Sequence, residues 1–115
     1  MIHSIIRIFA GAVAVCCATA VAAQDYPSRP VRMIVPFAAG GPTDVIARIV
    51  AQKLTEGFGH QVVVDNRAGA GGNIGSEAVY TSAPDGYTLL ASVPAALTTN
   101  VFLYKKLNFD PAKLE

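Results

Sequence analysis

Three apolar runs separate polar and glycine-rich stretches, and they predict three β-strands at Val31–Val35, Val62–Asp65 and Tyr87–Ala91. The first two runs are apolar at nearly every position rather than at every second one. This pattern is typical of strands that are covered on both faces, as in parallel sheets. Pro36 ends the first strand, because proline has no N–H to donate to a neighbouring strand.

Between the first two strands the apolar spacing changes to the three-and-four spacing of a helix, which predicts a helix over Thr43–Phe58. Thr43 and Asp44 are typical of a helix start, and Gly57 and Gly59 supply stop signals. The apolar residues form one predicted stripe: Val45, Ile46, Ile49, Val50 and Leu54.

The pattern then repeats. Asn73 is a good N-cap for a short helix over Ile74–Thr81, Ala83–Gly86 is a turn, and Leu97–Leu107 is a short helix or an irregular segment. Strands that alternate with helices indicate an α/β domain with a parallel sheet. We predict the strand order 2-1-3, with a ligand crevice at the carboxyl end of the first strand.

A loop of small residues follows each predicted strand at that end of the sheet. The first loop leads directly into a helix N-terminus, where backbone N–H groups and the helix dipole favour an anion. The second loop is rich in glycine, and the third loop runs over Ser92–Ala96. The loops therefore form a candidate anion site built from backbone amides.

The first residues read as a cleavable signal peptide, Met1–Ala23, with Arg7 before an apolar, alanine-rich stretch. An uncleaved membrane anchor is the alternative. A lipid anchor at Cys16 is disfavoured, because Val15 stands where a small residue is wanted. We therefore expect residues 24–115 to form the secreted, mature part, one small domain or part of a larger one.

Removal of residues 1–23 takes away both cysteines and one of the nine basic residues, which leaves eight basic and eight acidic side chains. The mature part then has no thiol chemistry and no basic surface for a nucleic acid. Its single histidine, His60, lies in a predicted turn at the other end of the sheet. Asp44 suits either a helix N-terminus or a pocket, and Asp65 closes a strand. We expect no catalytic residue, metal site or cofactor.

A nucleotide site is the competing interpretation. Gly69, Gly71 and Gly75 form a G-x-G-x-x-x-G pattern, but it follows the second strand rather than the first. Glycines needed for turns and close packing explain the same pattern, especially at Gly75.

Three motifs carry a family resemblance: Y-P-S-R-P-V-R-M-I-V-P-F-A-A-G-G-P-T-D at Tyr26–Asp44, V-V-V-D-N-R-A-G-A-G-G-N-I-G at Val62–Gly75, and A-P-D-G-Y-T-L-L at Ala83–Leu90. They resemble the start of the Bug receptors, the periplasmic solute-binding proteins of tripartite tricarboxylate transporters (TctC-like family). The resemblance runs from Tyr26 to about Pro111, with the motifs in family order.

The resemblance implies one lobe of a type II periplasmic-binding-protein fold, whose two lobes close on a small carboxylate delivered to membrane permease subunits. It implies two loops that grip a carboxylate and a contribution from the third. The expected binding residues are Phe37, Ala38, Ala39, Gly40, Gly41, Thr43, Asp44, Gly69, Ala70, Gly71, Gly72, Asn73 and Ser92. The third loop departs from the family pattern at Val93–Ala96, which has neither hydroxyl nor glycine residues.

Family members continue into a second lobe, so we expect this chain to be an amino-terminal fragment that binds weakly or not at all. Three hypotheses follow: a periplasmic carboxylate receptor, a secreted α/β enzyme that uses a nucleotide, and a fragment that does not work as a receptor.

Overall fold

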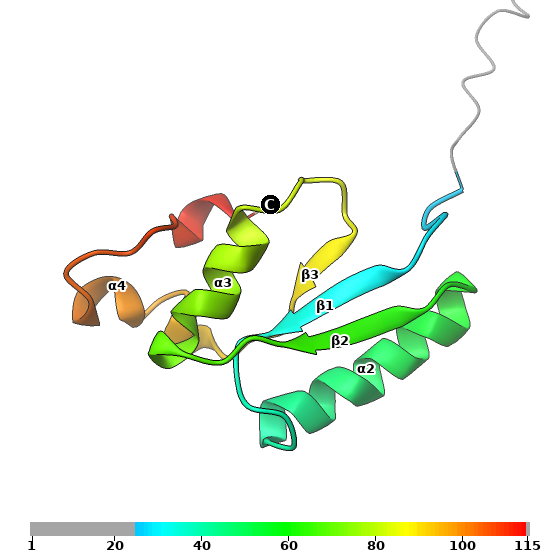
Figure 1. Cartoon of the computed structure of the whole chain (residues 1–115), viewed down its shortest axis with the longest axis horizontal. Coiled ribbons are helices and arrows are strands. Elements are labelled where there is room, and N and C mark those ends of the chain that lie inside the picture. Colours follow the sequence, from blue (N-terminus) through cyan, green and yellow to red (C-terminus); the bar gives the residue numbers. More distant parts are fainter. Residues whose placement is uncertain (1–24, 115) are drawn as a thin grey trace, which may run out of the picture.

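The computed structural model describes residues 25–114 and shows a parallel sheet of three strands (Figure 1). The strands are β1 (Val31–Val35), β2 (Val62–Asn66) and β3 (Thr88–Leu90). Their order is β2-β1-β3, with Met33 of β1 opposite Val64 of β2 and Leu89 of β3. The predicted α/β class and strand order are therefore confirmed.

Helices and short 3-10 turns connect and follow the strands. In chain order, the helices and 3-10 turns that follow β1 are α2 (Pro42–Phe58), η2 (Ala70–Gly72), α3 (Asn73–Tyr80), η3 (Pro94–Ala96), α4 (Asn100–Leu103) and η4 (Pro111–Lys113). The third strand is shorter than predicted, and the segment over residues 97–107 forms only one short helix. The predicted signal peptide lies outside the described residues, so its structure is not tested.

α2 and α3 pack on opposite sides of the sheet (Figure 1). Val31, Met33 and Val35 are buried on the α2 side, because alternate residues of a strand face alternate sides of the sheet. Ile34 is also fully buried, although it lies on the other side. The four apolar residues of β1 are thus explained by a strand covered on both faces, as predicted, while Arg32 remains exposed.

Of the five residues in the predicted apolar stripe of α2, only Leu54 packs against the core. Ala47 and Ala51 are buried against the sheet, and Leu54 is partly buried. Ile46 and Ile49 remain 63% and 59% exposed, and Val45 and Val50 also lie on the surface. Alanine lets the helix approach the sheet closely, so the bulkier side chains point outward along its flank.

The helix ends differ in part from the predictions. α2 is capped by Gly41, with Pro42 as its first residue, and it ends at Gly59 in the left-handed conformation (φ 68°). The stop signal at Gly59 is confirmed. The N-cap of α3 is Gly72, so the predicted N-cap role of Asn73 is wrong.

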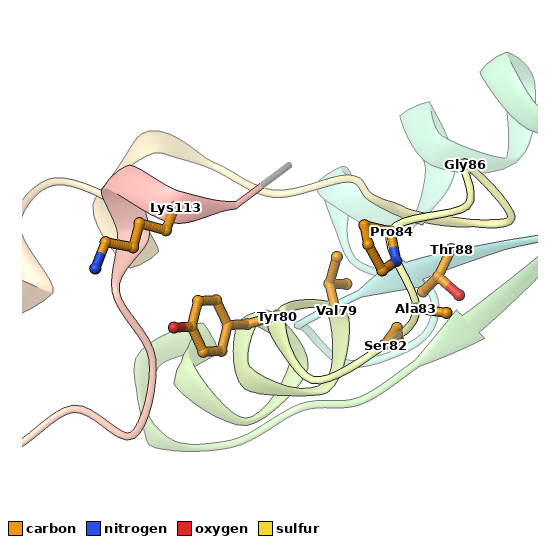
Figure 2. A pocket seen from close by; sticks show the side chains of 8 residues that line it. All are labelled: Val79, Tyr80, Ser82, Ala83, Pro84, Gly86, Thr88 and Lys113. Atoms are coloured by element: carbon orange, nitrogen blue, oxygen red, sulfur yellow. The ribbon is translucent and has the colours of Figure 1, made fainter.

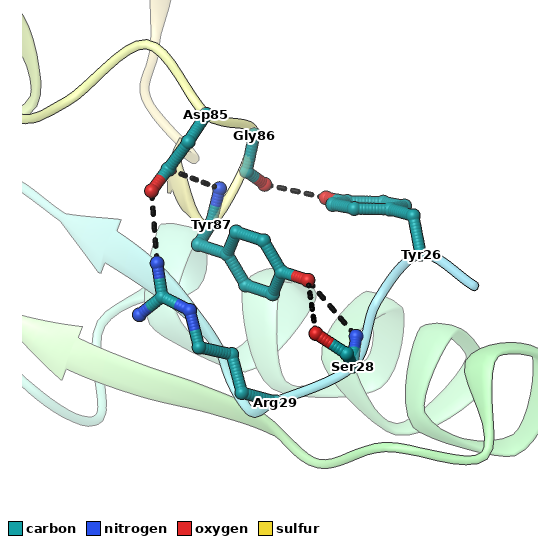
Figure 3. Close-up of polar contacts among 6 residues, drawn as sticks. All are labelled: Tyr26, Ser28, Arg29, Asp85, Gly86 and Tyr87. Atoms are coloured by element: carbon teal, nitrogen blue, oxygen red, sulfur yellow. Dashed lines mark hydrogen bonds and ion pairs between the residues drawn. The ribbon is translucent and has the colours of Figure 1, made fainter. Parts of the chain in front are cut away.

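The lead-in before β1 is tied to the turn before β3 (Figure 3). Arg29 pairs with Asp85 at 2.8 Å, and its guanidinium lies 4.0 Å from the centre of the Tyr87 ring. The Ser28 N–H donates to the Tyr87 hydroxyl at 2.9 Å, and hydrogen bonds with Ser28 lower the pKa of Tyr87. These contacts lie at the amino ends of β1 and β3, opposite the candidate site.

Candidate functional site

The first loop joins β1 to α2 and is held in a tight turn. The Gly41 N–H donates to the Ala38 carbonyl at 3.3 Å, and Gly40 has a φ of 82°, which glycine adopts without strain. Gly40 also donates its N–H to the Asp44 carboxylate at 2.8 Å. Ala38, Ala39 and Gly40 are exposed, so small residues form the open rim of this loop.

The second loop joins β2 to α3, and it has a run of unusual backbone conformations. Gly69, Ala70, Gly71 and Gly72 all have positive φ angles, of 136°, 46°, 63° and 96°. Three of these four residues are glycines, because residues with a Cβ rarely adopt such angles. The Gly72 N–H donates to the Gly69 carbonyl at 3.0 Å, which closes the loop just before α3.

All three loops meet at Gly72. A Cβ atom at Gly72 would lie 3.4 Å from Cζ of Phe37, in the first loop, and 3.0 Å from the Cβ of Ala96, in the third. The structure therefore brings the predicted first and second loops together at the carboxyl ends of the strands. The hydroxyl of Ser92, in the third loop, donates to the carbonyl of the neighbouring Val93 at 3.1 Å and not to the first or second loop.

Several backbone N–H groups at this end of the sheet donate to no other group in the described part of the chain. Within residues 25–114, the N–H groups of Thr43 and Asp44 donate to no protein acceptor, as expected for the first turn of a helix. The same holds for Ala70 and Gly71 in the second loop. Both loops thus offer donors suited to an anion.

Asp44 is almost completely buried, at 2% exposed, and its carboxylate is fully engaged. Arg48 Nε and the Gly40 N–H donate to one oxygen, and Asn66 Nδ2 donates to the other at 2.9 Å. Hydrogen bonds from Arg48, from Gly40 and from Asn66, in that order, lower the pKa of Asp44 from 3.8 to about 2. Asp44 is therefore ionised near neutral pH, and its carboxylate forms hydrogen bonds to other groups of the protein.

Asn73 is also held by a buried partner. Asn100 of α4 donates from Nδ2 to the Gly71 carbonyl at 3.0 Å and to Oδ1 of Asn73 at 2.6 Å. Because the Gly71 carbonyl only accepts, the Asn100 amide can be oriented in one way, and that orientation in turn sets the Asn73 amide. Sequence reasoning missed Asn66 and Asn100. An asparagine that directly follows an apolar run, as Asn66 does, is the signal that could have drawn attention to the first.

An apolar groove adjoins the loops. It has a volume of about 560 Å³, contains Thr43 and Ser92 at its margin, and runs between the exposed flank of α2 and β3. A smaller cavity of about 260 Å³ lies beside the C-terminal end of α3, the turn before β3 and Lys113 (Figure 2). None of the predicted binding residues lines the smaller cavity.

The remaining candidates for chemistry lie elsewhere or have structural roles. His60 is exposed in the turn before β2, and Asp65 pairs with Arg67 at 3.0 Å.

In the described part of the chain no group of three or more His, Cys, Asp or Glu residues could hold a metal ion. Over the same residues, no helix has the length and apolar character needed to cross a membrane.

The sequence model of the "Tripartite tricarboxylate transporter family receptor" matches residues 46–114, from α2 to the end of the described chain. The chain belongs to this receptor family. The match includes the second and third loops described above. It confirms the resemblance that the sequence motifs indicated.

Similar proteins agree with this assignment. Protein BugT of Bordetella pertussis is 57% identical over 79 residues, which cover 69% of this chain and 24% of BugT. Two solved structures share the fold of this receptor. R. palustris Rpa4515 with adipate has a TM-score of 0.73 and 41% identity, and covers 76% of this chain and 29% of its own. MatC (Rpa3494) from Rhodopseudomonas palustris with bound malate has a TM-score of 0.72 and 38% identity, with coverages of 76% and 30%.

The chain therefore spans about a quarter to a third of the length of the receptors that it matches. The family match over residues 46–114 contains β2, β3 and the second and third loops, whereas β1 and the first loop precede it.

Proposed function

We propose that this chain contributes the carboxylate-binding loops of a periplasmic receptor. This receptor delivers small organic acids to a tripartite transporter in the membrane. The observation that carries this proposal is the meeting of the first and second loops at Phe37 and Gly72, with free backbone N–H groups on both. Backbone N–H groups at a helix N-terminus are well suited to a carboxylate. Two structural neighbours are described with adipate and with malate, both dicarboxylates.

The proposed site is built from the residues predicted from the sequence, and Asp44 has a supporting role in it. In the first loop, Phe37–Gly41 form the walls and Thr43 supplies a backbone donor, while Asp44 holds the loop. In the second, Ala70 and Gly71 supply backbone donors, Gly69 and Gly72 close the loop, and Asn73 offers a side-chain amide. Ser92 contributes from the third loop through the margin of the groove.

Affinity sets a further condition. A helix N-terminus stabilises an anion by roughly 0.3–1 kcal/mol when exposed and up to about 2 kcal/mol when partly buried. Micromolar binding needs about 8 kcal/mol. The loops alone fall short, so we propose that the additional length found in the related receptors encloses the acid and supplies the remaining hydrogen bonds.

The role proposed is recognition, followed by transfer to permease subunits, and not catalysis. Small side chains and backbone amides dominate the loops, whereas the buried carboxylate of Asp44 is fully bonded to its neighbours. We also propose export to the periplasm through the predicted signal peptide.

The test is a thermal-shift and calorimetry screen of the full-length protein against malate, adipate, citrate and aromatic acids, with malamide as a neutral control that matches malate in shape. We expect at least one acid to raise the melting temperature and to bind with a measurable enthalpy, while malamide does neither. Nucleotides are screened in parallel. Binding of a nucleotide, without binding of any acid at millimolar concentration, would overturn the proposal in favour of the nucleotide enzyme.

A further inference from the structure

Asn66 makes contacts that link the two loops of the proposed site. It is the last residue of β2, pairs with Val35 at the end of β1, and directly precedes the second loop. Its Nδ2 donates to the Phe37 carbonyl at 3.1 Å and to Oδ1 of Asp44 at 2.9 Å. Its Oδ1 accepts from Arg48 at 3.2 Å. The whole amide is therefore used.

The direction of these bonds is forced by chemistry. The Phe37 carbonyl and the Asp44 carboxylate only accept hydrogen bonds, so the NH₂ group of Asn66 must face both. The guanidinium of Arg48 only donates, so it must face the oxygen. Asparagine is suited to this place, because an aspartate would set a second negative charge against Asp44.

Through these bonds Asn66 holds the first loop at two points. The first point is the Phe37 carbonyl, where the loop leaves β1. The second is Gly40, whose N–H is bound by the Asp44 carboxylate that Asn66 holds from its other side. The next residue, Arg67, donates its N–H to the Val35 carbonyl at 2.8 Å, so the second loop starts from the same rigid point.

We propose that Asn66 is a positioning residue of the ligand site, which fixes the first loop relative to the second through Phe37 and Asp44. Asn66 and Asp44 contact the loop and not the acid. The inference rests on the proposed function only for its effect on binding. The bonds of Asn66 are all made to groups of the protein, so its hold on the loop can be tested without an acid.

The experiment measures amide hydrogen exchange by NMR in the full-length protein without ligand. We expect the Gly40 N–H of the wild-type protein to be protected, since it is bound by Asp44. Asn66→Ala is expected to speed exchange at Gly40 at least tenfold, while exchange at Arg32, whose N–H donates to the Tyr87 carbonyl at 2.8 Å within the sheet, is unchanged.

The matched control is Asn108→Ala. Asn108 is exposed and makes one 3.3 Å hydrogen bond to Glu77, away from the loops, so this variant should leave Gly40 exchange at the wild-type rate. An unprotected Gly40 in the wild type overturns the proposal without any variant. Equal acceleration at Gly40 and Arg32 also overturns it, since that result reports a general loss of stability.

A second readout separates the positioning role from the proposed function. If the wild-type protein binds malate or adipate, Asn66→Ala is expected to weaken that binding at least tenfold, and Asn108→Ala to leave it unchanged. Unaltered affinity in Asn66→Ala overturns the positioning role. If no acid binds the wild type, the proposed function fails, and the exchange measurement still decides whether Asn66 holds the loop.

Discussion

Gly75 of α3 lies directly against Pro36, the residue that ends β1. A Cβ atom at Gly75 would sit 2.6 Å from the Cβ and 2.8 Å from the Cα of Pro36, and 3.0 Å from the Arg67 carbonyl oxygen. The absence of a side chain therefore lets α3 pack on the sheet. The last glycine of the G-x-G-x-x-x-G pattern is explained by packing and not by a nucleotide.

Gly75→Ala is expected to destabilise the fold by about 1–3 kcal/mol, because the helix must move away from β1 to admit the methyl group. The measurement is urea unfolding followed by circular dichroism. Gly57→Ala is the control, since Gly57 lies inside α2 with nothing within 4 Å of its Cβ position. There alanine should stabilise by about 0.5–1 kcal/mol. The opposite ranking would contradict the close contact at Pro36.

A charged side chain should lower the stability of the fold on the buried face of α2 but not on its exposed face. Ala51→Lys places an ammonium group against the core and is expected to cost about 2–4 kcal/mol. Ile49→Lys, at a position that is 59% exposed, is expected to change stability by less than about 0.5 kcal/mol. Thermal unfolding of the two variants provides the comparison. An equal loss in both would show that the outer flank is covered in the full-length protein.

The low pKa of Asp44 predicts how stability depends on pH. The folded pKa of about 2 lies below the ordinary value of 3.8, so the ionised group stabilises the folded state above about pH 4. This contribution should be lost as the pH falls from about 4 towards 2. Unfolding measured between pH 2 and 5 should therefore be less pH-dependent in Asp44→Asn than in the wild type. A carboxyl titration of Asp44 by NMR near pH 4 would contradict the described network.

Asn100 is expected to be essential for the second loop. Asn100→Leu leaves the Gly71 carbonyl and the Asn73 amide without their buried partner, which should cost about 1–3 kcal/mol. Asn108→Leu, at an exposed position, serves as the control and should have little effect. The two variants are compared by chemical denaturation. A neutral effect at Asn100 would mean that water replaces its bonds and that the second loop does not depend on α4.

Much of the fold follows from local patterns. The apolar character of Val31–Val35, interrupted only by Arg32, indicated a strand covered on both sides, and the pattern of strands and helices gave the parallel order. Gly59 gave the end of α2, because a left-handed residue after a helix strongly favours glycine. The positions of the first two loops at one edge of the sheet followed from the same reasoning, since parallel strands share a carboxyl end.

The errors came from contacts between distant parts of the chain. Four of the five residues of the predicted stripe of α2 lie on the surface, and only Leu54 packs against the core. The sheet instead contacts Ala47 and Ala51, because close approach favoured small residues over larger hydrophobic ones. Asparagine is a residue type that favours the N-cap position, but the N-cap of α3 is Gly72. Asn73 instead accepts a hydrogen bond from Asn100, which lies 27 residues away in the sequence.

For the first loop, the sequence by itself determined the strand, the small residues and the start of the helix, since these depend on the preferences of neighbouring residues. Only the tertiary structure decided the role of Asp44. Its carboxylate could have faced a ligand or the protein, and the choice depends on Asn66, which reaches it from another strand. Bonds between side chains of different elements exist only after the chain has folded, so no local pattern contains them.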